Sequence, residues 1–95
     1  MAAESDNRMN GLGYVVASGY REAIVTELDD GAATPSELAE ETDLELSNVS
    51  RALTQLRGRD SPVVELLVNE DRKQGRLYGL TEYGQDLVTK LEEVR

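Results

Sequence analysis

The chain has 95 residues with 19 acidic and 10 basic side chains and a formal charge of −9, and this length suits one domain with a single modest core. Because Cys, Trp, Phe and His are absent, disulfides, thiolate or imidazole metal sites and histidine acid–base chemistry are excluded, so we expect an aliphatic core and no metal or other cofactor. Neither a signal peptide nor a membrane-spanning apolar run is evident, so we expect a cytoplasmic protein without a membrane partner.

The N-terminal segment is polar and has no apolar periodicity, so we expect a flexible tail over residues 1–13 and a folded domain over residues 14–95. An apolar segment at residues 14–17 follows, and its pattern leaves the secondary structure open. Ser18 then caps a predicted helix that runs from Gly19 to about Asp29. The expected buried face of this helix consists of Tyr20, Ala23, Ile24, Val25 and Leu28. Residues 31–33 leave room only for a bridge or a very short strand.

The stretch from Thr34 to Gly58 predicts two helices separated by a short turn. Thr34 and Glu37 form a capping box, and the pattern breaks at residues 42–43, so the first helix should have about eight residues. The second helix should have roughly twelve residues and end near Gly58, with one apolar stripe that faces the core. That stripe consists of Leu46, Val49, Leu53 and Leu56.

The C-terminal third predicts a hairpin followed by a helix. The apolar, β-branched run from Val63 to Val68 indicates a mostly buried strand, and residues 76–80 are its expected partner. The polar connection at residues 69–75 is longer than a tight hairpin requires and should project into solvent. Thr81 can cap a final helix from Glu82 to about Val94. One side of that helix carries Tyr83, Leu87, Val88, Leu91 and Val94.

Two motifs resemble parts of a known family. The run L-x-x-x-T-x-L-x-x-x-x-V-S-R-A-L, from Leu38 to Leu53, resembles the helix-turn-helix of the MarR- and ArsR-like transcriptional regulators, and G-R-x-Y-x-L-T-x-x-G, from Gly75 to Gly84, resembles their second wing strand and its exit into the last helix. The resemblance implies an α+β winged helix-turn-helix fold with a three-helix core, a β-hairpin wing and a C-terminal helix. It also implies a regulator that binds double-stranded DNA.

The chain departs from this family in two places and has an unusual composition. Glu45 stands where the family often has Ser or Thr, and the link at residues 58–62 is longer than usual. The acidic excess, with eight Arg and only two Lys, resembles the proteins of salt-accumulating halophilic archaea. The alternative is an ordinary acidic soluble protein. Residues 46–76 differ from the rest of the chain, because they carry six basic and four acidic side chains.

The predicted DNA-binding residues lie on the second helix of the pair and on the hairpin. Opposite the apolar stripe, the helix presents side-chain types that read base edges or phosphates. The expected contacts from the helix are Ser47, Asn48, Arg51, Thr54, Gln55 and Arg57, and those from the wing are Arg72, Lys73, Gln74 and Arg76. The alternative is that Arg51 pairs with a carboxylate and that Glu70 and Asp71 neutralise the wing. Asp60 is close enough in sequence to pair with Arg57 or Arg59, and these two arginines rank below Arg51.

The last helix allows two interpretations. Leu87, Leu91 and Val94 either pack within the chain or, as the resemblance favours, pair with the same helix of a second subunit in a homodimer. The alternative function is a winged-helix protein–protein interaction module of the transcription machinery without its own DNA affinity. We do not expect an enzyme, because the acidic pairs 40–41 and 92–93 are adjacent on helices and point apart. The pattern identifies no small-molecule effector.

Overall fold

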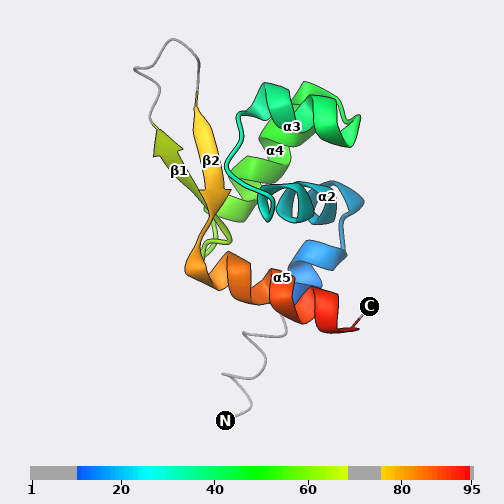
Figure 1. The fold of residues 1–95 in the computed structure, drawn as a ribbon, viewed down its shortest axis with the longest axis vertical. Coiled ribbons are helices and arrows are strands. Elements are labelled where there is room, and N and C mark those ends of the chain that lie inside the picture. Colours follow the sequence, from blue (N-terminus) through cyan, green and yellow to red (C-terminus); the bar gives the residue numbers. More distant parts are fainter. Residues whose placement is uncertain (1–10, 69–75, 95) are drawn as a thin grey trace.

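The computed structural model describes residues 11–68 and 76–94. The elements labelled in Figure 1 are α2 (Gly19–Leu28), α3 (Pro35–Thr42), α4 (Leu46–Arg57), β1 (Val64–Val68), β2 (Leu77–Leu80) and α5 (Glu82–Val94). Helices α2, α3 and α4 pack against one another, the hairpin lies beside them, and α5 lies at the opposite end of the molecule from α3 (Figure 1). This arrangement confirms the predicted α+β architecture of a three-helix core, a hairpin and a C-terminal helix.

The N-terminal boundary of the domain differs from the prediction. Residues 11–16 are helical, Val15 is buried, and Leu12 and Tyr14 pack against the same core. The predicted tail over residues 1–13 is therefore wrong for residues 11–13, while residues 1–10 lie outside the described part of the chain. The two glycines in this segment, Gly11 and Gly13, disfavour a helix by propensity, so the helix depends on its packing.

Helix α2 begins and ends close to the predicted residues. The hydroxyl oxygen of Ser18 accepts a hydrogen bond from the backbone N–H of Arg21 at 3.3 Å, which confirms the predicted N-cap. Ile24, Val25 and Leu28 are buried as expected, but Tyr20 is 47% exposed. At about 100° per residue, Tyr20 lies roughly 90° from the centre of the face formed by those three side chains, which places it at the edge of the packed surface.

The capping box of α3 is present as predicted. The backbone N–H of Thr34 donates to Glu37 Oε1 at 2.9 Å, and the N–H of Glu37 donates to Thr34 Oγ1 at 3.2 Å. The helix has eight residues and ends at Asp43, which adopts the left-handed conformation with φ of 61°. This geometry sets the short turn into α4, which has twelve residues.

One member of the predicted apolar stripe of α4 faces outward. Val49, Leu53 and Leu56 are buried, but Leu46 is 50% exposed, and Ala52 is buried in its place. Leu46 is the first residue of the helix and lies about 70° from the mean direction of the four buried side chains, at the usual 100° per residue. The prediction that Leu46 faces the core is therefore wrong.

The hairpin is antiparallel, and its strand β2 is also bridged to the segment before α3. Val64 pairs with Leu80 and Leu66 with Tyr78, and an irregularity between Leu66 and Val68 shifts the register. Ala33 and Tyr78 exchange two backbone hydrogen bonds, of 3.0 and 2.9 Å, on the other side of β2. This isolated bridge confirms the prediction for residues 31–33.

The backbone hydrogen bonds of one residue, Val63, connect the end of α4 with Thr81, the residue before α5. Its N–H donates to the carbonyl oxygen of Leu56 at 3.0 Å, and its carbonyl oxygen accepts from the N–H of Thr81 at 3.0 Å. The Thr81 hydroxyl donates to the Pro62 carbonyl oxygen at 2.6 Å and accepts from the N–H of Gly84 at 3.0 Å, so Thr81 caps α5 as predicted. The position of α5 is thereby tied to the C-terminal end of α4.

The core is aliphatic, as the composition predicts, and no polar or charged side chain is buried within the described residues. Leu87 and Leu91 of α5 are 2% and 6% exposed in the single chain. Both leucines are therefore buried within the chain, as in the first of the two interpretations of this helix.

Candidate nucleic-acid interface

The solvent-facing side of α4 carries four of the predicted contacts. Ser47, Arg51, Thr54 and Gln55 are exposed, and Asn48 is partly buried at the edge of this face. Among the described residues, Arg51 forms no hydrogen bond, ion pair or ring contact. The alternative in which Arg51 is neutralised by a carboxylate therefore does not occur in that part of the chain, and its donors face solvent.

Two other predicted DNA-contacting residues of α4 make contacts with other side chains of the same chain. The Gln55 Oε1 atom accepts a hydrogen bond from Arg21 Nη1 at 3.1 Å, so one acceptor position of that side chain is already occupied. The guanidinium carbon of Arg57 lies 5.8 Å from the ring centroid of Tyr78, which directs this side chain toward β2. Ser47, Arg51 and Thr54 thus form the part of the predicted site that is free to meet a ligand.

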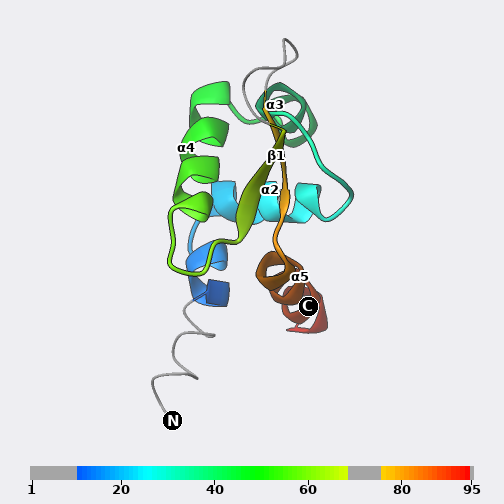
Figure 2. The same cartoon turned by 90° about the vertical axis from the view of Figure 1, so that its left-hand side faces the viewer.

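A cationic cluster that the sequence pattern did not identify lies at the C-terminal end of α4. Arg21 and Arg59 both contact the ring of Tyr14, with guanidinium carbons 3.8 and 4.3 Å from its centroid. Arg21 Nε also donates to the Tyr14 carbonyl oxygen at 2.8 Å. The three residues come from helix 11–16, from α2 and from the segment after α4, so no periodicity within one element indicates that they meet. Figure 2 shows helix 11–16 beneath the C-terminal end of α4.

The wing carries the remaining predicted contacts. Arg72, Lys73 and Gln74 lie outside the described residues. Arg76 is exposed and immediately precedes β2, the strand that the Tyr78 bridge connects to the core. Glu45, the departure from the family motif, is the N-cap of α4 and makes no side-chain hydrogen bond to the helix. The first turn of α4 therefore lacks the hydroxyl cap that the motif often supplies.

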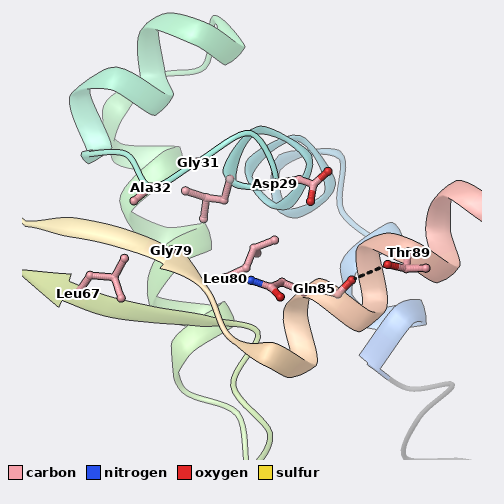
Figure 3. A pocket seen from close by; sticks show the side chains of 9 residues that line it. Asp29, Gly31, Ala32, Leu67, Gly79, Leu80, Gln85 and Thr89 are labelled. Carbon is pink, nitrogen blue, oxygen red and sulfur yellow. Dashed lines mark hydrogen bonds between the residues drawn. The ribbon is translucent and has the colours of Figure 1, made fainter.

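A depression of about 430 Å³ lies between the end of α2, the hairpin and α5 (Figure 3). Leu67 covers Gly79 within it, since a Cβ on that glycine would come 2.7 Å from the Leu67 Cδ1 atom. Asp29 is its only acidic or basic lining residue among those described. This lining contains no pair of groups for acid–base or nucleophilic chemistry.

Two features are absent from the described part of the chain. No group of three or more His, Cys, Asp or Glu side chains is placed there to hold a metal ion. None of the helices within the described ranges is long and apolar enough to cross a membrane.

Comparison with known proteins gives matches at the level of structure. No protein-family model and no curated protein matches the sequence. A ZitR mutant from Lactococcus lactis is 20% identical, with a TM-score of 0.70 over 80% of this chain and 51% of that chain. NMB1585, a MarR family regulator from Neisseria meningitidis, is 27% identical, with a TM-score of 0.63 over 76% of this chain and 50% of that one. The match thus spans about half the length of these two proteins.

The match to a third solved structure spans a larger share of that structure's chain. It is the homodimeric winged helix-turn-helix DNA-binding domain of Mb0332 from Mycobacterium bovis, described as a possible ArsR-family transcriptional regulator. It is 21% identical, with a TM-score of 0.75 over 98% of this chain and 82% of that chain. The fold is therefore that of a winged helix-turn-helix domain, in which α3 and α4 form the helix-turn-helix and β1 and β2 form the wing.

Proposed function

We propose that this chain is a DNA-binding transcriptional regulator that places α4 in the major groove. The observation that carries the proposal is the outward face of α4, where Ser47, Arg51 and Thr54 are exposed and Arg51 has no partner among the described residues. A chain with 19 acidic side chains nevertheless has no acidic residue on this helix. The 27% identical MarR family regulator of similar structure supports the same function.

In this proposal the residues of α4 have separate roles. Arg51 donates two hydrogen bonds to a guanine edge, and Asn48 and Ser47 contact adjacent bases. The wing residues Arg72, Lys73, Gln74 and Arg76 hold the phosphate backbone, with Arg57 near the hairpin. Gln55 contributes its amide nitrogen, because one acceptor position of its oxygen is occupied by Arg21.

We further propose that the regulator is a cytoplasmic homodimer that recognises a palindromic site, as the homodimeric domain of similar fold suggests. Because Leu87 and Leu91 are buried within one chain, the part of α5 that meets a second subunit must include side chains beyond these two. Val94, the third predicted dimer residue, is the last residue of α5. Sedimentation should give the mass of two chains, and a monomer at all concentrations would contradict the dimer.

A selection of bound duplexes from a random library, at several KCl concentrations, tests the function. We expect a conserved sequence that is palindromic if the dimer is correct. Failure to recover any duplex at low or high salt would contradict DNA binding and favour the protein–protein interaction module. The composition also suggests a salt-adapted protein of the halophilic archaeal type, so the selection must extend to molar KCl.

Replacing Arg51 tests the docking of α4. We expect Arg51→Ala to weaken binding to the selected duplex by about 1 to 3 kcal/mol and to relax the preference at one base pair per half-site. Fluorescence anisotropy at fixed salt measures both effects. Lys90→Ala on α5 is the control, because it also removes one cation but lies on a different helix, and sedimentation checks that this variant keeps the oligomeric state of the wild type. Equal affinities for the Arg51 variant and the wild type would contradict the model.

A further inference from the structure

The cluster of Tyr14, Arg21 and Arg59 holds two positive charges on one ring, and neither arginine contacts a carboxylate within the described residues. Each guanidinium carbon lies within 4.3 Å of the same ring centroid, so the two cations cannot be farther apart than the sum of their two distances from it. Their partners among the described residues are the aromatic ring, the Tyr14 carbonyl and the Gln55 amide, all of which are neutral. Two like charges at this separation repel each other, and a bound anion would relieve that repulsion.

Arg59 is not fully hydrogen-bonded by its surroundings. The Nε atom of Arg59 is buried and makes no hydrogen bond within the described part of the chain. A buried donor without a partner is unfavourable, and a chain with 19 acidic residues has many carboxylates that could pair with an arginine. Within the described residues, the contacts that hold the cluster in place therefore leave its positive charge without a neighbouring carboxylate.

The position of the cluster indicates which anion it meets. Arg21 Nη1 contacts Gln55, which lies on the last turn of α4, and Arg59 follows that helix directly. Helix 11–16 lies beneath this end of α4 in Figure 2. When a recognition helix lies in the major groove, the residues beyond its end approach the sugar–phosphate backbone that borders the groove.

We propose that Arg21 and Arg59 form a binding site for a phosphate of the DNA backbone at the C-terminal end of α4. This inference rests on the proposed function and adds a contact from outside the helix-turn-helix and the wing. Guanidinium groups match phosphate oxygens in charge and geometry. Because the Arg59 Nε atom is covered, the terminal nitrogens of its guanidinium reach the phosphate. The ring and the hydrogen bonds already orient Arg21, so little side-chain entropy is lost on binding.

Salt-dependent titrations test this site with the full chain. The wild type, Arg59→Gln and Lys90→Gln are titrated with the selected duplex and with a scrambled duplex at several KCl concentrations. We expect Arg59→Gln to weaken both duplexes by the same factor and to reduce the slope of log K against log [KCl] by about 0.9, the value for one lost phosphate contact. Lys90→Gln, at an exposed position of α5, should leave the slope unchanged, and sedimentation checks that it keeps the oligomeric state of the wild type.

Further variants separate charge from folding. Arg59→Lys keeps the charge and should restore the wild-type slope, whereas Arg59→Gln should retain the circular dichroism spectrum of the wild type. If Arg59→Gln unfolds the protein, Arg59→Lys and Arg21→Lys are compared instead, and both should bind with slopes equal to the wild type but with weaker affinity from the lost fork geometry. Unchanged affinity and slope in every folded variant overturns the phosphate site.

The source of the phosphate is distinguished by side-chain NMR of the Arg59 Nε–Hε group. We expect this resonance to shift on addition of the duplex and to shift much less with inorganic phosphate at equal ionic strength. A shift with inorganic phosphate and none with duplex overturns the backbone assignment. Arg51-dependent duplex binding with an unchanged Arg59 slope overturns this inference alone, whereas the absence of any duplex binding by the wild type overturns the proposed function as well.

Discussion

At Gly84 the backbone of α5 lies close to the backbone of Val63, the residue before β1. A Cβ placed on this glycine would overlap the carbonyl oxygen of Val63, a backbone atom that also accepts from Thr81. This contact gives a physical reason for the glycine in the L-T-x-x-G motif, which the sequence offered only as a resemblance. The glycine allows α5 to start directly beneath the junction between α4 and β1.

We expect Gly84→Ala to lower the free energy of unfolding by about 1 to 3 kcal/mol, because a backbone carbonyl cannot move aside as a flexible side chain can. Urea unfolding followed by circular dichroism measures the change. Gly19→Ala is the matched control, since a Cβ at Gly19 meets no atom within 4 Å, and its stability should be unchanged or slightly higher. Equal stability of Gly84→Ala and the wild type would contradict the close approach.

Leu46 and Leu53 provide a second comparison at this scale, because the sequence placed both on one apolar stripe. Leu53 is 2% exposed and Leu46 is 50% exposed. We expect Leu53→Ala to cost about 2 to 5 kcal/mol of unfolding free energy, because truncation leaves a cavity, and Leu46→Ala to cost less than about 1 kcal/mol. Thermal or urea unfolding checks both values. Similar losses for the two variants would show that Leu46 packs in the core.

At the scale of elements, α3 depends on its N-terminal cap. We expect Thr34→Ala to reduce the unfolding free energy by about 1 kcal/mol, since the hydroxyl that accepts from the Glu37 N–H is removed. Ser36→Ala, two residues farther along the same helix at an exposed position, should change stability by less than about 0.5 kcal/mol. If both variants lose the same amount, the cap does not stabilise the helix in solution.

The elements also differ in how their positions are specified. Helix α4 is linked to α5 through Val63 and Thr81, and β2 is linked to the segment before α3 through the Ala33 bridge. These backbone contacts connect the proposed groove-binding helix to both the hairpin and the C-terminal helix. In the proposed homodimer, α5 would set the orientation of α4 relative to the second subunit, so we expect the spacing of a palindromic site to be well defined.

At the scale of the whole molecule, the formal charge is −9, and no charged side chain within the described residues is buried. Self-repulsion of such a surface destabilises the compact state and is screened by salt. We expect the thermal midpoint to rise as KCl increases from about 0.1 to 1 M, where the Debye length falls from about 10 to 3 Å. Differential scanning calorimetry measures the midpoint.

A charge variant separates screening from other effects of salt. Glu40 and Glu41 are both exposed on α3, and replacing both by Gln removes two negative charges without altering the core. This variant should have a higher midpoint than the wild type at low KCl and a weaker dependence on KCl. A midpoint that does not change with KCl in either protein would contradict repulsion as a limit on stability.

Local patterns in the sequence determined most of the secondary structure. The capping box, the length of α3, the start of α5 and the bridge at Ala33 follow from interactions within a few residues or from the short distance available between helices. Apolar periodicity likewise identified Val49, Leu53 and Leu56, because a helix that packs on a core repeats its buried side chains every three or four positions.

Tertiary structure decided which surfaces these elements share. Leu46 turned outward because α4 packs through Ala52, and Leu87 and Leu91 are buried within one chain. Arg21 and Gln55 are 34 positions apart in the sequence and form a hydrogen bond only because α2 packs against α4. Contacts of this kind depend on how helices cross, which no periodicity within one helix specifies. The cluster around Tyr14 could therefore be recognised only in the folded molecule.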